Sequence, residues 1–178
     1  MADVTLLASN FAQLSKLKIL IVDDEPSNVF LLEELLQDAG YTRVTSLTDS
    51  SNAIETCLTL RPDLLLLDLM MPPPDGYAVL EAVRAAQHEV FMPVIVLTAD
   101  VSDKARRRAL AAGATDFLLK PFDPTEVLLR IRNLLEMRRL QVHLDTQRAA
   151  FEDAVYARAS EVRELQSLLN KAQTRPNE

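Results

Sequence analysis

Residues 64–72 read LLLLDLMMP, and this stretch decides the fold. Its four leucines do not alternate with polar residues, as they would in a strand with one face in water. An unbroken apolar run of this length is typical of a parallel strand that is buried on both faces. We therefore expect a central strand at Leu64–Asp68 that ends on an acidic residue, followed by a loop at Pro72–Gly76.

Similar short apolar runs recur along the chain, and helical patterns separate them. The other expected strands are Lys18–Val22, Arg43–Leu47, Pro93–Thr98 and Asp116–Lys120. The expected helices are Pro26–Ala39, one capped by Asp49 or Ser50, Tyr77–Gln87, Ser102–Ala112 and one that opens at Pro124. Strands that alternate with helices predict a parallel sheet covered on both faces. The sequence thus predicts an α/β, doubly wound, five-stranded parallel sheet with an extended C-terminal helix. We expect the flavodoxin-like order 2-1-3-4-5, one of the common orders of such sheets, in which the third strand lies in the middle.

The composition excludes several classes of protein. Of the 178 residues 48% are hydrophobic, so a packed core is expected rather than global disorder. The formal net charge of −7 disfavours contact with DNA or anionic lipid, and we expect neither direct DNA binding nor a membrane partner. No apolar run approaches the ~18–20 residues of a transmembrane helix. The single cysteine, Cys57, is expected to be buried and suits a reducing, cytoplasmic location.

Polar residues follow four of the expected strands in an ordered set. Asp23 and Asp24 follow the first strand, the third strand ends at Asp68, the fourth at Thr98 and the fifth at Lys120. In an open parallel sheet the carboxyl ends of the strands share one edge, where ligands bind. Three carboxylates this close repel one another unless a cation lies among them, and Mg²⁺ suits oxygen ligands of this kind. With the charge neutralised, a carboxylate is able to attack a phosphoryl donor. Each residue alone is more often a helix cap or a surface charge.

The chain resembles the receiver domain of two-component response regulators over roughly residues 16–137. The motifs that carry the likeness are VDDEP at 22–26, LLLLDLMMP at 64–72 with DG at 75–76, VIVLTA at 94–99, and AGATDFLLKPF at 112–122. One departure is visible, because Pro73–Pro74 stiffens the loop that follows the central strand.

The resemblance implies a role for each matching position. Asp68 would be the phospho-acceptor, to which Thr98 and Lys120 would bind the incoming phosphoryl group. Mg²⁺ would be held by Asp23, Asp24, Asp68 and the backbone carbonyl of Met70.

Two further expectations come from the same likeness. Phe117 would be the aromatic switch that reports phosphorylation through Thr98. The Lys120–Pro121 peptide bond is expected to be cis, since cis bonds are almost confined to X–Pro.

The C-terminal part carries a heptad pattern without Pro or Gly between Pro124 and Pro176. Positions three and four residues apart form an apolar seam of Leu134, Met137, Leu144, Phe151, Val155, Val162, Leu165 and Leu169. Gln141, Arg148 and Arg158 interrupt it. Such a seam favours a coiled coil with a second helix, and the alternative is a frayed amphipathic tail.

We therefore predict a leader at 1–17, a receiver domain at 18–137 and a helical coiled-coil extension at 138–178. The expected function is to accept a phosphoryl group from a histidine kinase or phosphotransfer protein and to relay this state through the fourth helix, fifth strand and fifth helix to a homodimer. No catalytic output is expected in this chain itself. The alternative is the regulatory front of a longer enzyme, such as a cyclic-di-nucleotide phosphodiesterase or cyclase or a hybrid kinase. A phosphatase of the haloacid-dehalogenase type is disfavoured, because Met70 stands where that type has a second Asp.

Overall fold

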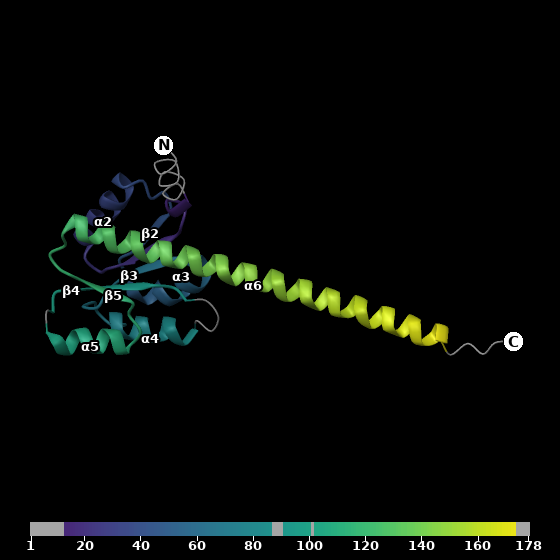
Figure 1. The fold of residues 1–178 in the computed structure, drawn as a ribbon. Coiled ribbons are helices and arrows are strands. Elements are labelled where there is room, and N and C mark those ends of the chain that lie inside the picture. Colours follow the sequence, from purple (N-terminus) through teal and green to yellow (C-terminus); the bar gives the residue numbers. More distant parts are fainter. Residues whose placement is uncertain (1–12, 87–90, 101, 174–178) are drawn as a thin grey trace, which may run out of the picture. The chain divides into compact units, whose positions relative to one another are not determined.

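The computed structural model of the chain describes residues 13–86, 91–100 and 102–173, with side-chain burial described as far as residue 166. Five parallel strands form one sheet in the order β2-β1-β3-β4-β5 (Figure 1). The strands are β1 (Ile19–Val22), β2 (Val44–Leu47), β3 (Leu64–Asp68), β4 (Val94–Thr98) and β5 (Asp116–Leu119). The predicted fold is confirmed.

The helices lie close to their predicted positions. They are α2 (Pro26–Asp38), the short 3-10 helix η1 (Ser50–Asn52) with α3 (Ala53–Leu60), α4 (Gly76–Ala86), α5 (Asp103–Ala111) and α6 (Pro124–Gln173). Of the two caps considered before α3, Asp49 accepts a hydrogen bond from the backbone N–H of Ser51 at 2.9 Å. The hydroxyl of Ser102 accepts one from the N–H of Ala105 and so begins α5. Gln87, the predicted end of α4, lies outside the described residues.

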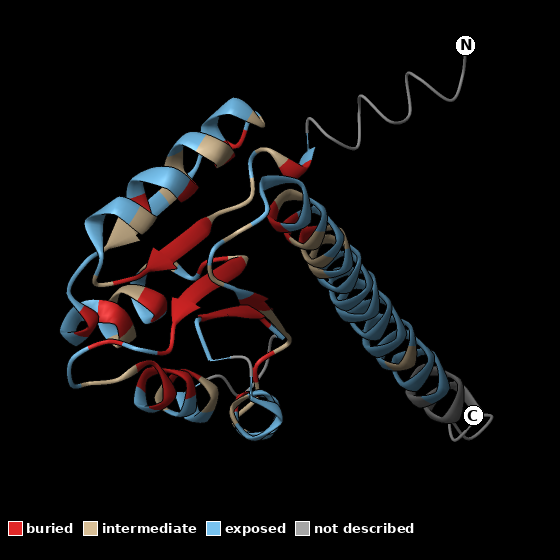
Figure 2. Cartoon of the chain, turned by 90° about the vertical axis from the view of Figure 1, so that its left-hand side faces the viewer, coloured by how far each residue is buried: buried red, intermediate tan, exposed pale blue. Residues whose placement is uncertain are grey.

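The unbroken leucine run of β3 divides its side chains between two hydrophobic cores. Leu65 and Leu67 enter one core, and Leu64 and Leu66 enter the other. Helices α3, α4 and α5 close the first core, and α2 and α6 close the second. Figure 2 shows the buried strands between these helical layers. Successive residues of a strand point to opposite faces, so an apolar run without polar residues requires both faces to be covered.

The second core extends to residues that precede the first strand. Leu14 is buried in the same cluster as Ile131 and Leu135 of α6. The backbone N–H and the hydroxyl of Thr42 both donate to the carbonyl of Ser15, each at 3.1 Å. The packed unit therefore includes part of the segment predicted as a leader, of which residues 1–12 lie outside the described residues.

Helix α6 belongs to two compact units, one ending at Arg139 and the other beginning at Leu140. In the first unit, Ile131 and Leu135 are fully buried. There Arg138 also lies with its Nε 3.5 Å from a carboxylate oxygen of Asp63, and donates a hydrogen bond to the carbonyl of Phe91 at 3.0 Å.

In the second unit, every described residue up to 166 is exposed except the partly exposed Ala159. No helix in the described part of the chain combines the length and the apolar composition that crossing a membrane requires.

The expected burial of Cys57 is confirmed, and burial raises the pKa of its thiol from 9.0 to about 11.

The thiolate is the reactive form, so we expect iodoacetamide at pH 8 to alkylate the native protein roughly a hundredfold more slowly than the urea-unfolded chain. Intact mass spectrometry counts the label at this single cysteine. Equal rates in the two states would contradict the burial. Because the unfolded thiol ionises first, the free energy of unfolding should also fall as the pH rises from about 9 to 11.

Candidate functional site

The carboxyl ends of β1, β3 and β4 bring the predicted polar residues to one edge of the sheet. Asp68 ends the central strand β3, Asp23 directly follows β1, and Thr98 ends β4. All three are buried, with 3%, 0% and 5% of their surface exposed. Buried carboxylates and hydroxyls require polar partners, so their contacts define the site.

Lys120 joins two of these carboxylates. Its Nζ donates to Oδ2 of Asp23 and to Oδ2 of Asp68, each at 2.8 Å. Its backbone N–H donates to the carbonyl of Thr98 at 2.8 Å, which ties the residue after β5 to the end of β4. Burial lowers the pKa of Lys120, but hydrogen bonds to Asp23 and Asp68, together with their charges, raise the pKa above its ordinary value of 10.5. The lysine is therefore protonated at neutral pH and is shared by two carboxylates.

The peptide bond between Lys120 and Pro121 is cis, which confirms the expectation from the sequence. The Pro73–Pro74 bond of the loop after β3 is also cis.

Asn28 is a site residue that the sequence analysis missed. Its side-chain amide donates to both carboxylate oxygens of Asp23, at 3.1 and 3.2 Å. The backbone N–H of Glu25 donates to the same carboxylate at 3.0 Å. Asp23 is thus held by the first turn of α2 as well as by Lys120. The sequence alone gives no reason to single out Asn28 among the polar residues near the start of the predicted helix.

The carboxylates of Asp23, Asp24 and Asp68 fit a divalent cation. Each offers an oxygen, and these oxygens all lie within 4.8 Å of one another. Asp24 is partly exposed, whereas the other two are buried, so the cluster opens to solvent on one side. Hard cations such as Mg²⁺ favour oxygen ligands of this kind and retain several waters. The structure brings together the three predicted acidic ligands.

Met70 contributes backbone rather than side chain to the site. Its N–H donates to Oδ1 of Asp68 at 3.1 Å, while 69% of the residue is exposed.

Gly76 permits the close approach of α4 to the end of β3. A Cβ atom at this position would lie 2.0 Å from the carbonyl oxygen of Asp68 and 2.6 Å from Cα of Leu69. The N–H of Gly76 donates to the carbonyl of Leu69 at 3.3 Å. The requirement for glycine here is therefore steric, and it acts directly on the backbone that carries Asp68. The sequence analysis noted the DG pair at 75–76 as part of a motif. Only the structure shows why glycine is required at position 76.

Thr98 and Phe117 line one hollow of about 90 Å³ beside the site. The hydroxyl of Thr98 accepts a hydrogen bond from the N–H of Asp100 at 3.0 Å. Phe117 lies on β5, partly buried against the first core. The structure thus places the predicted switch residue and the predicted hydroxyl on the same internal surface.

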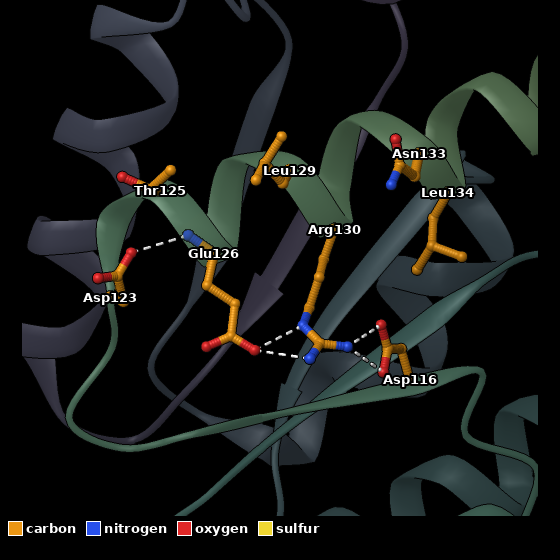
Figure 3. A pocket seen from close by; sticks show the side chains of 8 residues that line it. All are labelled: Asp116, Asp123, Thr125, Glu126, Leu129, Arg130, Asn133 and Leu134. Atoms are coloured by element: carbon orange, nitrogen blue, oxygen red, sulfur yellow. Dashed lines mark hydrogen bonds and ion pairs between the residues drawn. The ribbon is translucent and has the colours of Figure 1, made fainter.

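A second, more open hollow lies between β5 and α6 (Figure 3). Its wall contains Arg130, which donates to both carboxylate oxygens of Asp116 at 2.7 Å and to Glu126 at 2.6 and 2.9 Å. The hydrogen bonds to Asp116 and Glu126 raise the pKa of Arg130. None of the residues that line this hollow belongs to the acidic cluster, so the hollow is separate from the candidate site.

Comparison with known proteins agrees with this geometry. Residues 19–132 match the model of the response regulator receiver domain family. The alkaline phosphatase synthesis transcriptional regulatory protein PhoP of Bacillus subtilis is 39% identical over 118 residues, which are 66% of this chain and 48% of PhoP. The cyclic di-GMP phosphodiesterase response regulator RpfG of Xanthomonas campestris is 34% identical over 149 residues, which are 83% of this chain and 39% of RpfG.

A solved structure shows the same fold with a metal bound. The receiver domain of a sensor histidine kinase from Pseudomonas aeruginosa, with a magnesium ion coordinated in its active site cleft, has a TM-score of 0.62 and 33% identity. The likeness covers 68% of this chain and 98% of that one.

The chain therefore belongs to the response regulator receiver family and carries a receiver domain of two-component signalling. It spans about half the length of the first curated relatives that it matches. Their names describe transcriptional regulators, so the expected absence of DNA binding stays a prediction for this protein.

The steric role of Gly76 is testable. We expect Gly76→Ala to lower the free energy of unfolding by about 1–3 kcal/mol, because the added methyl group overlaps backbone atoms that cannot move independently. Urea unfolding followed by circular dichroism measures the change. Ala78→Ser, at an exposed position of the same helix, serves as the control and should change stability by less than about 0.5 kcal/mol. Equal stabilities of the two variants would contradict the steric account.

Proposed function

We propose that Asp68 accepts a phosphoryl group from a phosphohistidine of a histidine kinase or phosphotransfer protein. A carboxylate oxygen of Asp68 attacks phosphorus and forms a P–O bond while the P–N bond to the donor imidazole breaks. The electron pair stays on the imidazole nitrogen, which then takes a proton from water. The observation that carries this proposal is the shared contact of Lys120 with Asp68 and Asp23, because it supplies positive charge where phosphoryl oxygens would arrive.

Mg²⁺ is the proposed cofactor, held by Asp23, Asp24 and Asp68 with the carbonyl of Met70. When bound, it would neutralise negative charge on the carboxylates and on the transferred group. The compact set of acidic oxygens supports this assignment, as does the magnesium ion named for the Pseudomonas aeruginosa domain. Asn28 would keep Asp23 in a fixed orientation as the ligand set forms.

The remaining residues of the site would stabilise the phosphorylated state. Lys120 would exchange its bond to Asp68 for a bond to a phosphoryl oxygen, which keeps its charge paired. The Thr98 hydroxyl would turn from the N–H of Asp100 and donate to the phosphoryl group. Its movement would open the way for Phe117 to change position. The change would then reach the surface of α5, β5 and α6.

The output we propose is pairing of the second unit with the same helix of another copy. In the seam, Leu144, Phe151, Val155, Val162 and Leu165 are between 46% and 70% exposed in the single chain. A helix seldom keeps an apolar stripe of this length in water without a partner.

The remaining positions of the seam differ in their surroundings. Met137 is 41% exposed, and Leu134 packs partly against the second core. The side chain of Leu169 lies outside the described residues.

The polar positions of the seam are satisfied within their own helix. Gln141 donates to Asp145, Arg148 to Glu152 and Arg158 to Glu161. Exposed pairs of this kind contribute little stability, so they leave the apolar positions to determine assembly.

A second candidate is the regulatory part of a longer signalling enzyme. The match to RpfG favours it, because RpfG is named as a cyclic di-GMP phosphodiesterase and this chain covers 39% of it. In that case the helix would pass the state of the receiver to a catalytic domain.

Acetyl phosphate with Mg²⁺ tests the acceptor directly. We expect the wild-type chain to gain the mass of one phosphoryl group and Asp68→Asn to gain none, because the amide cannot form the acyl phosphate. Asp75→Asn is the matched control, since Asn retains an acceptor for the N–H of Ala78 at the start of α4. Labelling of Asp68→Asn at the wild-type level would show that the acceptor is misassigned.

Sedimentation equilibrium tests the seam. Phe151→Ser should raise the dimer dissociation constant at least about tenfold, since each copy loses a buried aromatic side chain. Tyr156→Ser removes a comparably exposed aromatic residue outside the seam and should leave the constant unchanged. Deletion of residues 140–178 should leave a monomeric receiver. A dimer that persists in the deletion variant would place the contact in the first unit.

A further inference from the structure

Two guanidinium groups from different helices lie near the ring of Phe117. Cζ of Arg106 on α5 lies 4.7 Å from the ring centroid, and Cζ of Arg130 on α6 lies 6.0 Å from it. A cation within about 6 Å of an aromatic face is attracted by the negative charge of that face. The ring therefore lies close to two positive charges, and Arg106 is the nearer of the two.

The two arginines differ in how firmly they are placed. Arg130 is fixed by Asp116 and Glu126, as Figure 3 shows, and Asp116 also accepts a hydrogen bond from the N–H of Phe117. Arg106 is exposed and lies closer to the ring. Arg106 is therefore the contact that a substitution removes without disturbing the ion pairs of β5 and α6.

A hollow lies beside the ring, and the proposed switch would turn Phe117 into it. Its volume is about 90 Å³, and its lining includes Val96, Thr98 and Ala109 as well as Phe117 and Arg106. The alanine leaves space that a larger side chain would fill. The Thr98 hydroxyl, which would turn toward a phosphoryl group on Asp68, lies on the same wall.

We infer that Arg106 is a positioning residue that holds Phe117 outside this hollow and so sets how readily the phosphorylated state forms. The inference rests on the proposed function, because it requires that the ring moves when Asp68 is phosphorylated. A group that binds only the resting position stabilises the resting state and opposes every ligand that favours the other state. Arg106 therefore acts as a restraint on the switch, at a distance from the phosphorylated residue.

Calorimetric titration of the full chain with beryllofluoride in the presence of Mg²⁺ measures this restraint. Arg106→Ala should bind the phosphoryl mimic about two- to fivefold more tightly than the wild type, as expected for the loss of one exposed cation–π contact. Arg107→Ala removes the same charge from the same helix, where its guanidinium donates to the carbonyl of Asp103, and should leave the affinity unchanged. Simple loss of positive charge near the site would weaken binding of this anion in both variants.

A second background separates positioning from a general effect on α5. In Phe117→Leu the ring is absent, so adding Arg106→Ala should change the affinity by less than about 1.5-fold. Equal affinities of Arg106→Ala and Arg107→Ala in the wild-type background would overturn the inference, as would an Arg106 effect that persists without the ring. If the wild-type chain fails to bind beryllofluoride, the proposed function fails as well. Wild-type binding that Asp68→Asn abolishes would keep the proposed function, whatever Arg106 does.

Discussion

The contact between Lys120 and the two carboxylates of Asp23 and Asp68 is the interaction on which the site depends. Two buried acids at the ends of neighbouring strands lie together because one ammonium group, from the residue after β5, neutralises part of their charge. The contact also requires that β1, β3 and β5 end at the same edge, as parallel strands do, and the strand order makes β1 and β3 direct neighbours. Lys120 thus partly neutralises the same carboxylates that form the acidic cluster.

The backbone around this network is built to keep Asp68 in place. The leucines that precede it enter two separate cores, so β3 is unable to shift by one residue without exchanging both sets of side chains. Gly76 brings α4 against the carbonyl of Asp68, and the N–H of Met70 orients the carboxylate. The Thr98 hydroxyl and the ring of Phe117, which are proposed to move, lie farther out beside the hollow. In the proposed switch, the fixed carboxylate and the groups that would move are therefore separate.

The sequence predicted the strands and the five polar residues at their ends, because hydrophobic period and strand ends are local properties. The strand order came from the common order of doubly wound sheets. It did not predict the role of Asn28, because the hydrogen bonds of its amide to Asp23 depend on the angle at which α2 leaves β1. The steric need for Gly76 depends on how closely α4 approaches β3, which composition does not determine. The stacking of Arg106 and Arg130 on Phe117 joins residues of two helices and a strand, so no spacing rule reveals it. All three features were missed for the same reason. Each depends on how closely two secondary-structure elements pack, which the sequence alone does not give.

Helix α6 changes the kind of contact that stabilises it near Arg139. Before that point Ile131 and Leu135 are fixed by the core, and after it the described contacts are bonds between neighbouring turns, such as Arg148 with Glu152. Recombination at Leu140 would exchange one downstream module for another without altering any residue of the core. The heptad phase is the condition, because inserting one residue rotates all later side chains by about 100° around the helix axis. A gene fusion at this junction would therefore keep the core of the receiver unchanged. Its one geometric requirement would be that the heptad positions stay in phase across the junction.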